Sequence, residues 1–317
     1  MKKIVSIILT AVMLTAILCS CGEKTEVSQG IQIVCTAFPQ YDFIKNILGS
    51  ENGITLLLDN GADLHSYEPT AQDIIKIGSS DIFVYIGGAS DSWVEGAIKS
   101  ANNPGLKTVA LMNLVDTYDV EYIDGMEHDS HEAHDGDHSE EDEHIWLSLR
   151  NAKIITEALC DIICEADSEN AETYKANTAD YINSIENLDS EYKAAVSSAK
   201  RNTLLFADRF PFRYLTEDYS LNYHAAFAGC SSESEASFKT IAFLIDKTNE
   251  LELPAIIIIE GTDGTEGSIA KTVSDATKAK ILTLDSCQSV SKADIESGTT
   301  YLGIMQNNLD VLREALN

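Results

Sequence analysis

One amphipathic segment, between about Ser168 and Lys200, divides this chain of 317 residues into two parts. Its apolar and aromatic positions recur mostly at three- and four-residue steps, which predicts a single long helix that Ser168 is placed to cap. On either side, short β-rich runs alternate with amphipathic stretches, the pattern of parallel sheets with crossover helices. We therefore predict an α/β protein of two lobes joined by one long helix, with a ligand cleft between them. The apolar positions of the helix are Tyr174, Tyr181, Ile185, Leu188 and Tyr192.

The same patterns give the expected elements and domain boundaries. We expect an N-terminal lobe over 31–150, a helical region over 151–200 and a C-terminal lobe over 201–317. The expected strands are 31–36, 54–58, 81–86 and 107–111 in the first lobe and 203–206, 255–259 and 281–284 in the second. The expected helices follow Pro39 and Pro69 and surround Trp93 and Pro211, and others cover 238–251, 267–276 and 301–316.

The first residues have the features of an export signal. Lys2 and Lys3 precede an apolar run that is too short for a stable membrane span. The sequence Leu18-Cys19-Ser20-Cys21 resembles a bacterial lipobox, in which the chain is cut before a lipidated cysteine. We expect a signal peptide over 1–20, lipidation of Cys21 and a polar tether over 21–30, which would place the protein outside the cytoplasmic membrane.

The net charge excludes one class of partner. Asp and Glu number 51 against 22 Lys and Arg, so the formal net charge is -29. A surface of this charge repels nucleic acid and raises the local concentration of cations.

A stretch over 126–143 consists almost entirely of Asp, Glu, His, Gly and Ser. With so few apolar residues it cannot form a core, and we predict a mobile surface loop. Its imidazoles among carboxylates suit weak capture of metal ions, although a solvated insertion without metal affinity has the same composition. The histidines are His128, His131, His134 and His138.

Two other histidines lie at better-defined positions. His65 belongs to a polar loop between an expected strand and an expected helix, and His144 stands where apolar sequence resumes after the acidic stretch. An imidazole binds a transition metal through one nitrogen while the other nitrogen is held by a neighbouring group. Both are therefore candidate ligands.

The motifs around these histidines resemble those of one family. Gly61-Ala-Asp-Leu-His65-Ser-Tyr-Glu-Pro, a His-rich acidic insertion and His144-Ile-Trp-Leu-Ser-Leu-Arg-Asn-Ala occur in the order found in the zinc- and manganese-binding cluster of ABC-transporter solute-binding proteins. The resemblance implies two α/β lobes bridged by one long helix, with the metal between the lobes. It also implies a monomer that delivers the ion to the permease and ATPase subunits of an importer. The His-rich insertion favours zinc over manganese.

In that family two further segments supply ligands, and this chain departs from the usual residues in both. Asp208 falls where zinc binders carry His and manganese binders carry Glu, with a helix cap or an ion pair as its alternative role. His224 competes with it as third ligand, but its place in an apparent strand favours a packed histidine. Asp285 is the candidate fourth ligand, and Gln288 occupies the position where some relatives carry His.

Other interpretations stay open. A disulfide between Cys230 and Cys287 is plausible after export, whereas Cys160 and Cys164 more plausibly pack on one face of a helix. An exported zinc hydrolase lacks support because no His-Glu-x-x-His or Gly-x-Ser-x-Gly motif occurs. A surface lipoprotein that buffers zinc or adheres to host molecules would have the same sequence features as an importer component.

Overall fold

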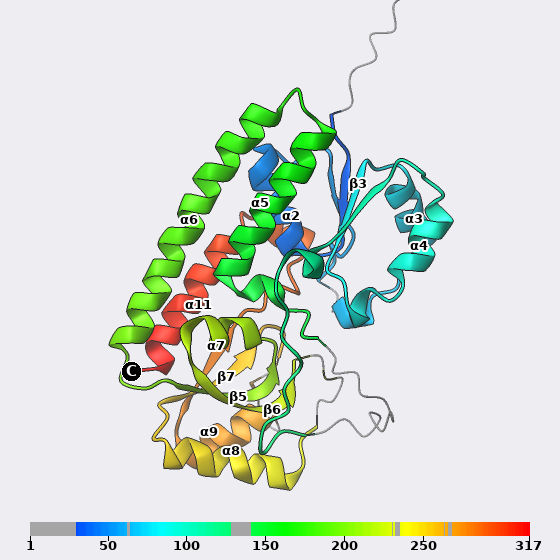
Figure 1. Ribbon diagram of the computed structural model, residues 1–317. Coiled ribbons are helices and arrows are strands. Elements are labelled where there is room, and N and C mark those ends of the chain that lie inside the picture. The colour runs from blue at the N-terminus through cyan, green and yellow to red at the C-terminus, as the bar shows by residue number, and fades with distance from the viewer. Residues whose placement is uncertain are drawn as a thin grey trace, which may run out of the picture. The chain divides into compact units, whose positions relative to one another are not determined.

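The computed structural model describes residues 30–317 except 62–63, 128–140, 230, 232–234, 263 and 266–267. Its first part alternates strands and helices, as expected (Figure 1). The elements, with η for a 3₁₀ helix, are β1 (Ile33–Cys35), α2 (Phe38–Leu48), β2 (Ile54–Leu56), η1 (Leu64–Ser66), α3 (Ala71–Gly78), β3 (Ile82–Tyr85), η2 (Ala89–Asp91), α4 (Val94–Ala101), β4 (Lys107–Ala110), η3 (Leu111–Leu114) and η4 (Ile145–Leu147).

The strands of the first part form a parallel sheet in the order β2-β1-β3-β4. Ile33 of β1 lies opposite Ile54 of β2 on one side and Ile82 of β3 on the other. Figure 1 shows α3 and α4 on one side of β3, and α2 and α5 on the other. Every residue of β1 is buried, which explains why the sequence shows a continuous apolar run here rather than an alternating one.

Two helices connect the parts, α5 (Leu149–Ala166) and α6 (Ala171–Ser198). The predicted long helix is confirmed as α6, and all five of its predicted apolar positions are buried. It packs against α2 of the first part and α11 (Tyr301–Ala315) of the second, so it bridges both. The prediction that Ser168 caps this helix is wrong, because the helix begins after Asn170.

The second part forms another parallel sheet, in the order β6-β5-β7-β8. The first strand of this part was expected to end at residue 206, but β5 continues to Phe210 across an irregularity in its pairing with β6. The elements are β5 (Thr203–Phe210), α7 (Arg213–Tyr219), β6 (Asn222–Ala228), α8 (Phe238–Glu250), β7 (Ala255–Ile259), α9 (Ile269–Thr277), β8 (Lys280–Leu284), α10 (Lys292–Glu296) and α11.

The predicted fold class is therefore confirmed. The main hydrophobic core is continuous through both parts, from Ile33 in β1 through Tyr192 in α6 to Leu309 in α11. Residues 31–317 form one compact unit, and the lobe boundaries over 31–150, 151–200 and 201–317 stay a prediction. No helix within the described residues has both the length and the apolar character of a membrane span.

The exposed part of the acidic stretch is shorter than its composition predicts. Met126, Asp142 and Glu143 are buried, which corrects the expectation that all of 126–143 forms a surface loop. Next to Met126, the backbone N–H of Glu127 donates to the carbonyl of Ala226 at 2.9 Å, so this end of the stretch is attached to β6. The four histidines of this stretch lie outside the described residues.

The cysteines divide into one packed pair and isolated thiols. Cys160 and Cys164 lie one turn apart on α5 with their sulfur atoms 3.8 Å from each other, in agreement with the predicted packing. Cys287 is a free, fully buried thiol, in contrast to the disulfide that the sequence allowed. Its proposed partner Cys230, like Cys21, lies outside the described residues.

Candidate metal site

The structure brings His65 and His144 together from distant positions in the sequence. His65 lies in η1, in the connection from β2 to α3, and His144 immediately precedes η4. Their ring centroids are 5.5 Å apart, with an angle of 57° between the ring planes. This is a separation at which two imidazoles can bind one ion.

His144 is held in one orientation by Asp142. The Oδ1 atom of Asp142 accepts hydrogen bonds from the backbone N–H of His144 at 2.9 Å and from its Nδ1 at 2.8 Å. An ionised carboxylate only accepts, so Nδ1 is the donor in this bond and Nε2 is the ring nitrogen left to bind a metal. That Nε2 is buried and has no hydrogen-bond partner, in a residue that is 0% exposed. The arrangement is that of an imidazole prepared for a metal ion.

His65 has a neutral partner instead. Its Nδ1 lies 2.7 Å from the hydroxyl oxygen of Ser90, in η2. The backbone N–H of Ser90 donates to Oε1 of Glu143 at 2.8 Å. Two consecutive acids therefore support the pair: Asp142 accepts from His144, and Glu143 accepts from Ser90, the partner of His65.

The pair lies where the two parts of the chain meet. The indole N–H of Trp146 donates to the carbonyl of Ser286 at 2.8 Å. Gly229, at the end of β6, also approaches His144 closely. A methyl group on Gly229 would lie 3.3 Å from Cε1 of His144 and 2.8 Å from the carbonyl oxygen of Phe210, so the contact requires glycine.

Asp208 has both carboxylate oxygens engaged by backbone N–H groups. It lies inside β5, and its Oδ2 accepts from the backbone N–H of Ile259 in β7 at 3.0 Å. Its Oδ1 accepts from the backbone N–H of Arg209 at 2.8 Å. Both oxygens thus satisfy backbone groups at the irregularity in β5, a role different from the helix cap or ion pair that the sequence suggested.

His224 is a packed histidine, as its place in a strand predicts. It lies in β6 with its ring edge-on to that of Phe243, at a centroid distance of 5.5 Å. Burial, with a smaller contribution from Lys247, lowers the pKa of His224. It is therefore a poor candidate for the third ligand.

Asp285 follows β8, as expected of the fourth ligand, but its carboxylate caps the chain. Its Oδ1 accepts from the backbone N–H of Cys287 at 2.8 Å. Burial raises its pKa. Nearby, Oε2 of Glu260 accepts from the backbone N–H of Ser286 at 2.7 Å, and burial together with the charge of Asp285 raises the pKa of Glu260 to about 7. Glu260 therefore fastens the segment after β8.

Among the described residues, no group of three or more His, Cys, Asp and Glu side chains is arranged to hold a metal. The structure thus joins two of the four predicted ligands, His65 and His144, whereas Asp208 and Asp285 accept hydrogen bonds from backbone N–H groups. Sequence reasoning missed Asp142, Glu143 and Ser90. The sequence assigned Asp142 and Glu143 to the acidic stretch. Their position directly before His144, a candidate ligand, was the available signal that they could orient it.

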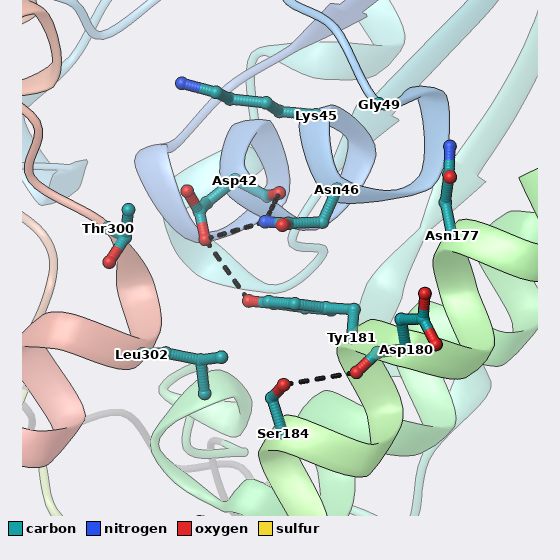
Figure 2. A pocket seen from close by; sticks show the side chains of 10 residues that line it. All are labelled: Asp42, Lys45, Asn46, Gly49, Asn177, Asp180, Tyr181, Ser184, Thr300 and Leu302. Carbon is teal, nitrogen blue, oxygen red and sulfur yellow. Dashed lines mark hydrogen bonds between the residues drawn. The ribbon is translucent and has the colours of Figure 1, made fainter.

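A separate cavity of about 470 Å³ lies between α2, α6 and the start of α11. Figure 2 shows Asp42 at its wall, hydrogen-bonded to Asn46 and Tyr181. Burial raises the pKa of Asp42. No candidate metal ligand lines this cavity, so it is distinct from the histidine pair. Its lining residues are Asp42, Lys45, Asn46, Gly49, Asn177, Asp180, Tyr181, Ser184, Thr300 and Leu302.

Comparisons with known proteins agree with the fold. The zinc-binding lipoprotein AdcA of Streptococcus pneumoniae is 28% identical over 317 residues, which cover 99% of this chain and 61% of AdcA. The high-affinity zinc uptake system protein ZnuA of Bacillus subtilis is 27% identical over 296 residues, covering 93% of this chain and 90% of ZnuA. The crystal structure of the Zn(II)-bound ZnuA-like domain of Streptococcus pneumoniae AdcA matches with a TM-score of 0.72 at 26% identity, covering 90% of this chain and 99% of that domain.

The extent of these matches differs between relatives. The chain spans 55% to 61% of the length of the AdcA relatives it matches. The model of the family described as "zinc-uptake complex component A periplasmic" matches residues 33–315, which is nearly all of the described part of the chain. The chain therefore belongs to this family of zinc-uptake components, as its resemblance to metal-specific solute-binding proteins predicted.

Proposed function

We propose that the protein is an extracytoplasmic solute-binding protein that captures Zn²⁺ and delivers it to the permease of an ABC importer. The observation that carries the proposal is the buried Nε2 of His144, which has no hydrogen-bond partner and lies beside a second imidazole, with 5.5 Å between the ring centroids. A buried polar atom without a partner is unfavourable unless a ligand occupies it. The zinc-binding relatives support zinc as the ion.

His65 and His144 are the protein ligands that we propose for the ion. Zinc usually takes four ligands, so other groups must complete its coordination. Asp285 is the better of the two predicted carboxylates, since its hydrogen bond to Cys287 engages Oδ1 alone, whereas Asp208 uses both oxygens. Recruitment of Asp285 would require its carboxylate to turn from the backbone N–H of Cys287 towards the ion. Manganese accepts the same donor types, so the choice of ion must be measured.

The remaining features of the proposal come from the sequence and from relatives. Export and lipidation at Cys21 would hold the protein at the outer face of the membrane, where a monomer could meet the permease. The ATPase subunit would act on the cytoplasmic side. The protein itself would bind and release the ion and would catalyse no reaction.

Calorimetric titration of the metal-free protein with zinc, and then with manganese, tests the proposal. We expect one tight zinc event that is lost in His144→Ala and His65→Ala. The matched control is His224→Ala, which removes a histidine packed against Phe243 and should leave the event intact. A deletion limited to residues 128–140 separates this site from the His-rich stretch and spares the buried Met126, Asp142 and Glu143.

Loss of the tight event on deletion of 128–140, together with unchanged binding in His144→Ala, would refute the histidine pair as the site. Zinc uptake by a strain lacking the protein tests delivery. Uptake that remains normal at low zinc would indicate a buffering or adhesive lipoprotein rather than an importer component.

A further inference from the structure

Glu143 is a buried carboxylate that nothing in the proposed metal chemistry uses. It is 1% exposed, and its Oε1 accepts from the backbone N–H of Ser90 at 2.8 Å. Its Oε2 is buried without a hydrogen-bond partner. Burying a carboxylate with one unsatisfied oxygen costs free energy, so the burial of Glu143 calls for a physical reason.

A glycine packed against Glu143 leaves room for its carboxylate. Gly88, which precedes η2, has φ of 101°, and a methyl group on it would lie 2.7 Å from Oε1 and 3.0 Å from Cδ of Glu143. Any other residue at this position would displace the carboxylate. At the other end of η2, Oδ2 of Asp91 accepts from the backbone N–H groups of Ile86 and Gly87 at 2.7 and 2.9 Å. Two buried acids, Glu143 and Asp91, thus hold the η2 turn in place.

The residue that η2 presents is Ser90, whose hydroxyl oxygen lies 2.7 Å from Nδ1 of His65. A metal bound through Nε2 of His65 needs the ring proton on Nδ1, and that proton needs an acceptor at a fixed position. Because Glu143 holds the Ser90 backbone, it fixes where that acceptor lies.

We propose that Glu143 is a positioning residue that orients His65 for metal binding through Ser90, while the adjacent Asp142 orients His144. Through this one dipeptide the two imidazoles, 79 positions apart in the chain, keep a common geometry. The inference rests on the proposed function for its purpose, but the contact from Glu143 through Ser90 to His65 can be tested without metal.

The first measurement compares zinc affinities by competition with a chromophoric chelator. Partners of metal ligands typically contribute about 10- to 100-fold in affinity, so Glu143→Ala should weaken zinc binding by at least about tenfold. Glu143→Gln retains an oxygen for the Ser90 N–H and should lose less than Glu143→Ala. The matched control is Glu141→Gln, because Glu141 is on the same segment but contacts Thr117.

A double-mutant cycle tests the route through Ser90. Ser90→Ala removes the hydroxyl and keeps the backbone N–H. If Glu143 acts through Ser90, the double variant should bind zinc about as weakly as the weaker single variant, because the two changes break one connection. Effects that multiply would overturn the route.

The second measurement is ¹⁵N NMR of the histidine rings in metal-free protein, which reports the tautomer of each ring. Glu143→Ala and Ser90→Ala should change the His65 signals in the same way and leave the His144 signals unchanged. Unchanged His65 signals and unchanged affinity in Glu143→Ala would overturn the inference even if His65→Ala abolishes zinc binding. If instead the His65 signals respond but wild type fails to bind zinc, the positioning role stands and the proposed function fails.

Discussion

Asp142→Asn tests how strongly the orientation of His144 determines metal affinity. In the wild type, one carboxylate oxygen accepts from both the backbone N–H and Nδ1 of His144 at 2.9 and 2.8 Å. The residue is itself held in place, because its carbonyl accepts from the hydroxyl of Tyr214 at 2.7 Å and its N–H donates to the carbonyl of Tyr118 at 2.7 Å. The substitution should therefore change the charge of the acceptor without moving the chain.

The expected magnitude follows from the hydrogen bond between Asp142 and Nδ1 of His144, which is the one that orients the ring. A hydrogen bond to a charged group contributes about 1.5–3 kcal/mol and one between neutral groups about 0.5–1.5 kcal/mol. Neutralising the acceptor should thus cost about 1–1.5 kcal/mol of orienting free energy, which is roughly a tenfold loss of zinc affinity. An amide can also rotate to donate to Nδ1, which would place the ring proton on Nε2 and block the metal. Asp142→Ala removes the acceptor altogether and should lose up to about 100-fold.

The assay is chelator competition near pH 7.5, with circular dichroism to establish that each variant folds. Asp42→Asn is the matched control, since Asp42 is also a buried carboxylate that accepts hydrogen bonds but lies at the separate cavity (Figure 2). It should reduce stability and leave zinc affinity unchanged. Zinc affinity of Asp142→Asn within about twofold of wild type, or an equal loss in Asp42→Asn, would refute the reasoning.

Three further changes test other parts of the structure. Burial raises the pKa of Glu260 to about 7 in the folded state, so between about pH 4.5 and 7 the folded state binds more protons than the unfolded state. The free energy of unfolding should therefore fall by up to about 3 kcal/mol as pH rises through this window. Urea unfolding of metal-free Glu260→Gln should show a flatter pH profile than wild type, and an identical slope would contradict the burial argument. Tyr192→Phe removes the hydrogen bond that the tyrosine hydroxyl donates to the carbonyl of Met305 at 2.6 Å, and it should reduce the free energy of unfolding by about 0.5–1.5 kcal/mol without affecting zinc affinity. Gly229→Ala should lower both the melting temperature and zinc affinity, because its methyl group would press on His144, and a melting temperature equal to that of wild type would show that the contact can relax.

Much of the fold was predictable because its signals are local. The buried stripe of α6 repeats at helical spacing, so its five apolar positions predict both the helix and the face that packs. The buried strands β1 and β3 consist of continuous apolar residues, which identifies them as central strands of a parallel sheet. The cap of α6 was not predictable in this way, because Ser168 and Asn170 are both good capping residues, and Asn170 takes the position without a side-chain capping hydrogen bond.

The composition of the acidic stretch gave no sign of the residues that support the candidate metal site. Asp142 and Glu143 end a run of acidic residues, and composition alone gives no reason to separate the last two from the rest. They differ physically because the apolar residues after His144 draw them into the interior, where a carboxylate must find hydrogen-bond donors. The nearest donors are those of His144 and of Ser90, which is 53 positions from Glu143 in the sequence.

The two carboxylates predicted as further ligands show a limit of a different kind. A carboxylate at the end of a parallel strand can bind a cation or can accept from unpaired backbone N–H groups, and both roles require the same residue at the same place. Asp208 takes the second role because the irregularity in β5 leaves the N–H of Ile259 within its reach, a register that depends on strands 51 residues apart. Asp285 also caps the chain, but through Oδ1. The first part of the chain therefore supplies two oriented imidazoles. Whether the second part adds a carboxylate depends on how readily Asp285 exchanges its backbone partner for the ion, so zinc affinity in Asp285→Asn is the measurement that separates a two-part site from one built on the histidine pair alone.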